Sequence, residues 1–237
     1  MSNNPRFLSH NIPELGQTLF LDAEESAHCH RVLRIRTGER VCIIDGKGTV
    51  AEAVVKDSHL KQTTVVIESR VFSPQKSDIQ LAFGLTKPPS LEIIFKKCTE
   101  IGVRSFQPLI TDHSLHPQSW NSERWNKLLM EACKQCQDPW LPTLEEPVKI
   151  QSWIKQRTPD RRLFFCDENS RHSPHLPSFP EGADILVGPE GGWSQAERVL
   201  LQDVTSSPLG LGSNRLRSET ACLVSLTIVK LLRGELS

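Results

Sequence analysis

The sequence predicts two domains, a small β domain followed by a larger α/β domain. Three observations predict this fold. Short β-branched runs dominate the first 70 residues, strands and helices alternate from residue 78 onward, and a polar segment with a proline at residues 73–77 separates the two patterns. The length of 237 residues suits one or two domains of about 150 residues each. We therefore expect domains at residues 1–72 and 78–237, with a linker at residues 73–77.

The N-terminal domain is expected to be a small barrel or sandwich. Its strand candidates are the β-branched runs at residues 41–45, 49–55 and 63–69, and Asp45 begins a glycine-containing turn between the first two. Residues 24–40 are the most basic stretch of this domain. They are expected to form one or two helical turns followed by a loop.

The C-terminal domain should alternate strands with helices. Its strand candidates are the apolar runs at residues 79–85, 106–110, 162–168 and 183–189. Apolar residues recur every three or four positions at residues 91–102 and 122–136, which predicts two amphipathic helices. Pro139 stops the second of these helices, because proline cannot continue the hydrogen-bond pattern.

Two further helices are predicted near the C-terminus. Ser194 and Glu197 have the spacing of a capping box, in which each side chain bonds to the backbone N–H of the other residue, so a helix should begin there. The segment at residues 218–232 is apolar on nearly every face. A helix of this kind is buried, either in the core or in a subunit interface.

Composition narrows the classes of protein. The formal net charge is zero, so any affinity for nucleic acid has to come from a local basic patch. Seven cysteines, an odd number without dense spacing, fit a reducing compartment better than a disulfide framework. No apolar stretch is long enough to cross a bilayer, and the N-terminus lacks the apolar core of a signal peptide. We expect a cytoplasmic protein that does not contact the membrane.

Two glycine-bearing segments, residues 187–192 and 209–217, indicate a ligand site. Each leads into a predicted helix, and the first holds three glycines where an ordinary turn needs about one. Glycine lets the backbone approach a ligand closely, and open α/β sheets bind ligands at the carboxyl ends of their strands. The two segments therefore predict one shared pocket, with Ser218 as a helix cap after the second.

Polar residues of the second segment are candidates for chemistry. Asn214, Arg215, Arg217 and Glu219 stand in or beside a loop between apolar elements, where such residues are often functional. The alternative is helix capping, in which Glu219 favours the helix dipole. Neither segment contains a phosphate-binding loop, a dinucleotide-binding G-x-G-x-x-G or a G-x-S-x-G. Enzymes of nucleoside triphosphates, ordinary dinucleotide enzymes and serine hydrolases are thus disfavoured.

The two segments resemble one known family. The sequences VGPEGGWSQAE at residues 187–197 and LGSNRLRSETA at residues 211–221 are similar to the signature of the RsmE family, SPOUT-class methyltransferases that modify N3 of a uridine in small-subunit ribosomal RNA. Members usually have an arginine where this chain has Asp138. The resemblance also includes residues 6–7, 28, 32–34, 38, 45–46, 48, 97, 99–103 and 131–132.

The resemblance implies a fold, a cofactor and a partner. The fold is a C-terminal SPOUT-type methyltransferase domain with a deep trefoil knot, preceded by a small PUA-like β-barrel domain that binds RNA. The cofactor is S-adenosyl-L-methionine, and two chains form a homodimer. The partner is 16S ribosomal RNA within the 30S subunit, which is methylated at N3 of one uridine.

The resemblance further implies roles for particular residues. Arg217 is expected to orient the uracil or to stabilise its N3 anion, because a fixed cation favours the charged form of a neighbouring acid. Glu190 and Glu219 are candidate proton acceptors. The residues expected to bind the cofactor are Leu186, Gly188, Pro189, Glu190, Gly191, Leu209, Gly210, Leu211, Gly212, Asn214 and Leu216.

Contact with RNA is expected from the basic stretch of the first domain. A run of charges is most often a solvated face, but a barrel-like domain joined to a methyl-transfer domain favours RNA. If Arg31, Arg34, Arg36 and Arg40 each meet a phosphate, the plot of log affinity for single-stranded RNA against log salt concentration should have a slope of about −3. The residues expected to contact RNA are Arg6, His28, Arg31, Arg34, Arg36 and Arg40.

Three alternatives are less favoured. Cys133, Cys136, His113 and His116 would supply four zinc ligands, but both cysteines lie on one predicted helix, so no metal is expected. A non-catalytic ribosomal RNA-binding protein with a vestigial cofactor pocket would not need both segments intact. A small-molecule enzyme with a Rossmann fold would need a dinucleotide fingerprint and would not need the basic stretch.

Overall fold

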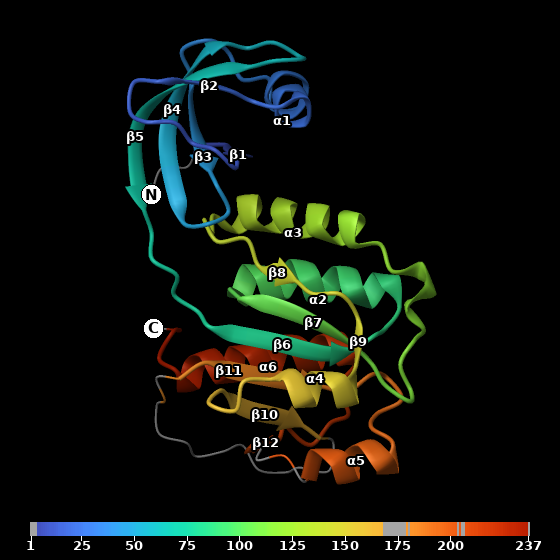
Figure 1. Cartoon of the computed structure of the whole chain (residues 1–237). Coiled ribbons are helices and arrows are strands. Elements are labelled where there is room, and N and C mark those ends of the chain that lie inside the picture. Colours follow the sequence, from blue (N-terminus) through green and yellow to red (C-terminus); the bar gives the residue numbers. More distant parts are fainter. Residues whose placement is uncertain (1–3, 168–178, 180, 203, 205–206, 237) are drawn as a thin grey trace. The chain divides into compact units, whose positions relative to one another are not determined.

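The computed structural model describes residues 4–167, 179, 181–202, 204 and 207–236 (Figure 1). The chain forms two compact units. The first comprises Met1–Gln75 and Cys133–Leu141, and the second comprises Lys76–Ala132 and Pro142–Ser237. Each domain predicted from the sequence is one continuous range, whereas the first unit also contains residues 133–141. No pattern in the sequence places these residues in the first unit.

The first unit is built on a five-stranded sheet with the order β1-β3-β4-β5-β2. β1 and β3 are parallel, and the other neighbouring strands are antiparallel. Helix α1 (Ala23–Ala27) and a π-helical turn (His28–Val32) follow β2. The strands are β1 (Arg6–Leu8), β2 (Thr18–Phe20), β3 (Arg40–Ile44), β4 (Thr49–Asp57) and β5 (Thr64–Phe72). The three predicted strands and the predicted helical turns are thus confirmed.

Alternating burial in β4 shows which face of this sheet meets the core. Ala51, Ala53 and Val55 are fully buried, and the residues between them are partly exposed. Successive side chains of a strand point to opposite faces, so these three share one face. They pack with Phe7 and Ile43 in the apolar core of the unit.

The second unit contains a sheet with the order β12-β10-β11-β6-β7-β8, and β9 also pairs with β7. All of these pairs are parallel, so the carboxyl ends of the strands lie along one edge. The strands are β6 (Ile79–Gly84), β7 (Ser105–Ile110), β8 (Thr143–Leu144), β9 (Val148–Lys149), β10 (Arg162–Cys166), β11 (Ala183–Val187) and β12 (Ser207–Leu209). The four predicted strands correspond to β6, β7, β10 and β11, and residue 168 of the third lies outside the described residues.

Helices cover both faces of this parallel sheet (Figure 1). α6 packs on α2, β6 and β11. On the other face, Ile150 and Trp153 of α4 and Leu201 of α5 join Leu186 in one apolar cluster. The helices are α2 (Pro88–Ile101), α3 (Ser122–Cys136), α4 (Ile150–Gln156), α5 (Gln195–Gln202) and α6 (Ser218–Leu232), with a 3-10 turn at Pro117–Ser119. Among the described residues, no helix has the length and apolar character needed to span a bilayer.

Three predicted helix ends are confirmed. α2 ends at Gly102, whose φ of 89° is the left-handed conformation of many helix ends. In the capping box, Ser194 N donates to Glu197 Oε2 (2.9 Å) and Glu197 N donates to Ser194 Oγ (3.3 Å). Helix α3 ends at Cys136, and Gln137 follows it with a φ of 63°.

The start of the last helix differs from the prediction. Its N-cap is Arg217, and Ser218 is its first residue, so the prediction that Ser218 caps this helix was wrong. The Ser218 hydroxyl instead donates to the carbonyl oxygen of Gly188. The helix buries only one face, because Cys222 is fully buried whereas Leu231 is 63% exposed. Leu231 is therefore not covered by the part of the chain that the structure describes.

Candidate functional site

The two glycine-bearing loops meet at the carboxyl edge of the parallel sheet. The first loop follows β11 and leads into α5, and the second follows β12 and leads into α6. Only β10 stands between β11 and β12, so both loops leave the sheet close to each other. Two hydrogen bonds join them. Ser218 Oγ donates to the carbonyl oxygen of Gly188 (3.2 Å), and Arg215 Nη2 donates to that of Glu190 (3.4 Å).

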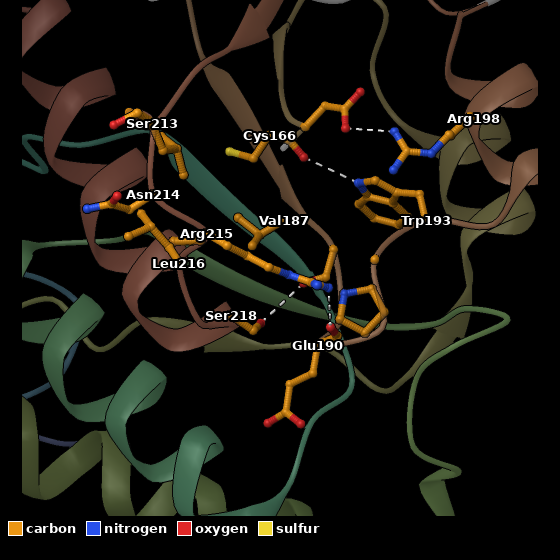
Figure 2. Close-up of a pocket in the computed structure, with 17 residues that line it drawn as sticks. Cys166, Val187, Glu190, Trp193, Arg198, Ser213, Asn214, Arg215, Leu216 and Ser218 are labelled. Atoms are coloured by element: carbon orange, nitrogen blue, oxygen red, sulfur yellow. Dashed lines mark hydrogen bonds and ion pairs between the residues drawn. The ribbon is translucent and has the colours of Figure 1, made fainter. Parts of the chain in front are cut away.

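A cavity of about 340 Å³ opens between these loops (Figure 2). Its volume lies in the range of about 300–1,000 Å³ that is typical of small-molecule sites. The wall combines loop backbone with apolar side chains such as Val187 and Leu216 and with the charged side chains of Arg198 and Arg215. The arrangement suits a ligand that has both polar edges and apolar surface.

Most residues predicted to bind a cofactor line this cavity, and four do not. Leu186 and Leu209 are fully buried inside their strands. Gly191 and Gly210 belong to the loops but lie outside the cavity wall. The predicted residues that line it are Gly188, Pro189, Glu190, Leu211, Gly212, Asn214 and Leu216.

Glycines allow the first loop to pack tightly against its surroundings. A Cβ at Gly188 would lie 3.1 Å from the indole of Trp193, and a Cβ at Gly191 would lie 2.8 Å from the Cβ of His113. Trp193 fills the space beside the loop and donates from Nε1 to the carbonyl oxygen of Cys166 (3.3 Å). The run of glycines is therefore required by close contacts and not only by the turn.

The cavity wall also contains residues outside the two predicted segments, among them Cys166, Asp167 and Arg198. Cys166 ends β10, and Asp167 follows it. Arg198 lies on α5, and its Nη1 is 2.7 Å from Oδ1 of Asp167. Burial raises the pKa of the Cys166 thiol to about 12, so this thiol is neutral at physiological pH. The available signal was the place of Cys166 and Asp167 near the end of the strand predicted at residues 162–168. This signal was not sufficient to place Cys166 in the cavity wall, because the sequence does not show that β10 lies between β11 and β12.

The candidate catalytic residues differ in their relation to the cavity. Glu190 lines it, but its carboxylate points away from the other labelled side chains in Figure 2 and accepts a hydrogen bond from Thr86 Oγ1 (3.4 Å). Glu219 is 8% exposed and lies outside the wall, and its Oε2 has no hydrogen-bond partner among the described residues. Arg217 is exposed at the start of α6 and does not line the cavity, whereas Arg215 does.

Four of the five arginines predicted to contact RNA are exposed on the surface of the first unit. Arg31, Arg34 and Arg36 are exposed in the segment between α1 and β3. Arg34 has a φ of 54°, an uncommon left-handed conformation that in other proteins often accompanies function. Arg40 is also exposed but pairs with Glu68, with 3.2 Å between Nε and Oε2. Arg40 is thus exposed but already paired with a carboxylate of the same sheet.

Two other residues predicted to contact RNA have partners inside the first unit. Arg6 Nη1 donates to the carbonyl oxygen of Gln137 (3.2 Å). His28 is half-buried, with its ring edge-on to a phenyl ring of β1. Asp138, in the position where an arginine is usual in the resembled family, accepts a hydrogen bond from the backbone N–H of Trp140 (2.9 Å). The side chain of Asp138 therefore holds the turn that follows α3.

The disfavoured zinc ligands have other partners. Within the described ranges, no group of three or more histidine, cysteine, aspartate or glutamate residues could hold a metal ion. The thiol of Cys133 donates to the carbonyl oxygen of Trp140 (3.4 Å). Nδ1 of His113 lies 3.1 Å from the carbonyl oxygens of Gly191 and Gly192. His113 thus contributes to holding the first glycine-bearing loop.

Comparison with protein families identifies both parts of the chain. A family model described as an RNA methyltransferase domain matches residues 73–230, and one described as an RNA methyltransferase PUA domain matches residues 21–68. A relative from Synechocystis named ribosomal RNA small subunit methyltransferase E is 30% identical in an alignment of 224 positions, gaps included, that covers 91% of this chain and 73% of the relative. A relative of the same name from Bacillus subtilis is 29% identical in an alignment of 245 positions, gaps included, that covers 94% of each chain.

Solved structures share the fold. The structure of ribosomal RNA small subunit methyltransferase E from Neisseria gonorrhoeae, bound to S-adenosyl methionine, has a TM-score of 0.93 at 22% identity and covers 99% of this chain and 100% of that one. A protein of Legionella pneumophila, solved in complex with the bound cofactor SAM, has a TM-score of 0.87 at 26% identity and covers 97% and 98%. With the PUA match, these likenesses confirm the predicted fold class of an α/β methyltransferase domain preceded by a PUA-like domain.

Proposed function

The chain belongs to the RNA methyltransferase family, and we propose that it transfers the methyl group of S-adenosyl-L-methionine to N3 of one uridine in 16S ribosomal RNA. The observation that carries this proposal is the joining of the two glycine-bearing loops into one cavity at the carboxyl edge of the parallel sheet. The names of the relatives support small-subunit ribosomal RNA as the substrate. The choice of N3 of uridine rests on the resemblance of the two loop sequences.

The residues around the cavity fit S-adenosyl-L-methionine. This ligand needs backbone donors and acceptors for its adenine and ribose and apolar walls for its other surfaces. Backbone at Gly188 and Gly212 and apolar side chains at Val187 and Leu216 are present in the wall. A Cβ at Gly212 would meet no atom within 4 Å, so a ligand can reach the backbone there. When bound, the cofactor supplies an electrophilic methyl group.

Methyl transfer to N3 of uracil requires that the N3 proton is removed and that the resulting anion is stabilised. We assign the second task to Arg217, because a fixed cation lowers the pKa of a neighbouring acid and Arg217 stands directly before Ser218 of the cavity wall. Arg215 is a second cation in the same loop and lines the cavity. Glu190 is a better candidate for the proton acceptor than Glu219, because only Glu190 lines the cavity.

The first unit would hold the RNA through Arg31, Arg34 and Arg36, whose exposure in one segment supports contact with phosphates. We also propose that two chains form a homodimer. The exposure of Leu231 supports this, because a helix that is apolar on nearly all faces needs a second surface to cover it. Three further proposals rest on the resemblance. The methyltransferase domain contains a trefoil knot, the substrate is 16S ribosomal RNA within the 30S subunit, and the protein acts in the cytoplasm.

Two measurements on the same protein test the proposed function. Calorimetric titration should detect binding of S-adenosyl-L-methionine, and incubation with the labelled cofactor should transfer label to RNA of 30S subunits and not to RNA of 50S subunits. Absence of cofactor binding would support the alternative of an RNA-binding protein with a vestigial pocket. Cofactor binding together with label in 50S RNA alone would contradict the proposed substrate.

A further inference from the structure

A second cavity of about 340 Å³ opens in the second unit. Its walls come mainly from the segments that follow β6 and β7, two neighbouring parallel strands whose carboxyl ends share the edge of the sheet used by the first cavity. A hydrogen bond from Leu115 N to the carbonyl oxygen of Leu85 (3.0 Å) joins these two segments. The second cavity therefore occupies a position at which open α/β sheets bind ligands.

Two indole rings form part of the wall of the second cavity. Trp120 and Trp125 have ring centroids 6.2 Å apart, with planes tilted by 42°. Trp125 is 3% exposed and packs against Phe95 in the core, whereas Trp120 is only half-buried and lies in the loop before α3. Aromatic walls of this kind stack on the faces of nucleobases with little dependence on the base. Trp120 is the more accessible of the two for this purpose.

Both indoles also carry a donor without an acceptor. Nε1 of Trp120 and Nε1 of Trp125 are buried and have no hydrogen-bond partner among the residues that the structure describes. An unpaired buried donor is costly, and a ligand that reaches it would contribute the missing acceptor. The keto oxygens and ring nitrogens of nucleobases are such acceptors. Exposed polar side chains at His116 and Gln118 line the same cavity.

Thr86 and Glu190 connect the two cavities. Thr86 lines the second cavity and Glu190 lines the first, and Thr86 Oγ1 donates to Glu190 Oε1 (3.4 Å). In Figure 2 the carboxylate of Glu190 points away from the other labelled residues of the first cavity, which is consistent with this contact. A ligand in the second cavity would thus lie next to the place of methyl transfer but not within it.

We propose that the second cavity binds one unstacked nucleobase of the RNA, adjacent to the uridine that is methylated. This proposal rests on the proposed function. An enzyme that modifies a base has to take it out of the stack, which leaves the neighbouring bases without a stacking partner. Stacking on Trp120 replaces the stacking partner that a neighbouring base loses. The second cavity then fixes the register of the strand and brings the target uridine to the first cavity.

Two substitutions of Trp120 test this role. Trp120→Leu removes the aromatic face and the N–H but keeps an apolar side chain, and Trp120→Phe is the matched control that keeps a face. We expect Trp120→Leu to lower kcat/KM for 30S subunits by about five-fold to a hundred-fold, the effect of losing one stacked base, and Trp120→Phe to retain most of the activity. Both variants should bind S-adenosyl-L-methionine as the wild type does, because Trp120 does not line the first cavity.

Cross-linking locates the bound base. A ribosomal RNA fragment with 4-thiouridine beside the target uridine should cross-link under light to residues 115–125 of the wild type and lose this product in Trp120→Leu. Equal kcat/KM in wild type and Trp120→Leu, or cross-links only to other segments or to a ribosomal protein, would overturn the proposal. If the wild type transfers no methyl group, the proposed function fails, but the affinity of this fragment for wild type and Trp120→Leu still decides whether the cavity binds a base.

Discussion

Ser218 and Gly188 are 30 positions apart in the chain, and a hydrogen bond of 3.2 Å runs from Ser218 Oγ to the carbonyl oxygen of Gly188. Ser218 begins α6 and Gly188 follows the last residue of β11. The bond therefore holds the start of the last helix against the end of a strand within the parallel sheet. Together with the bond from Arg215 to the carbonyl oxygen of Glu190, it joins the two loops that border the first cavity.

Ser218→Ala should weaken binding of S-adenosyl-L-methionine by about two-fold to ten-fold, the range expected for one net hydrogen bond. The control is Thr227→Ala in the same helix, where the exposed hydroxyl donates to the carbonyl oxygen of Leu223 (2.8 Å). Calorimetric titration of both variants measures the effect. Equal cofactor affinity in Ser218→Ala and wild type would show that the contact does not position the loops.

Gly84→Ala should disturb the cofactor cavity, because Gly84 packs against Pro189 of the first loop. A Cβ at Gly84 would lie 2.6 Å from Pro189 Cδ and 2.7 Å from Pro189 N, so the backbone of the loop would have to move. We expect a loss of about 1–3 kcal/mol in the free energy of unfolding, measured with urea, and weaker cofactor binding. Gly234→Ala also costs stability, because Gly234 has a φ of 70°, but it should leave cofactor affinity unchanged, because Gly234 lies outside the cavity wall. A wild-type affinity in Gly84→Ala would contradict the tight packing of this loop.

Arg217→Ala should lower kcat by about a hundred-fold and leave cofactor affinity unchanged, because the lost cation acts on the uracil anion and not on the cofactor. Arg217→Lys should recover part of the rate, since the charge is retained. Arg215 lines the cofactor cavity, so Arg215→Ala should weaken cofactor binding as its main effect. Single-turnover rates and calorimetry separate the two effects. Unchanged turnover in Arg217→Ala would remove this residue from the chemistry.

RNA binding should depend on salt through the exposed arginines of the first unit. If Arg31, Arg34 and Arg36 each meet one phosphate, the plot of log affinity against log salt concentration has a slope of about −2, compared with about −3 for four contacts. Arg34→Ala should make the slope shallower by about 0.7. Arg40→Ala is the control, because Arg40 already pairs with Glu68. A flat salt profile of the wild type would exclude this surface as the place of RNA contact.

Local patterns in the sequence were sufficient to predict most elements of the fold. The apolar period in α2 and α3, the β-branched runs in β3, β4 and β5 and the capping box of Ser194 and Glu197 all depend on residues close together in the chain. The membership of residues 133–141 in the first unit could not be predicted in this way. It depends on contacts such as that of Arg6 with Gln137, which are 131 positions apart.

The site was predicted only as far as its loops. Three glycines close together indicated the first loop, but Cys166 and Asp167 enter the cavity wall because β10 lies between β11 and β12. Sheet order is a property of the whole unit and not of any short segment. The second cavity depends on sheet order in the same way, because its walls come mainly from segments that follow two different strands.

The most direct test of the proposed function is the identity of the methylated nucleoside. Small ribosomal subunits that lack the modification are incubated with the protein and labelled S-adenosyl-L-methionine, and the RNA is then digested and analysed by mass spectrometry. The account predicts label in N3-methyluridine at one position of 16S ribosomal RNA. Label in a ribose methyl group or in another base, or no transfer by a protein that binds the cofactor, would contradict it.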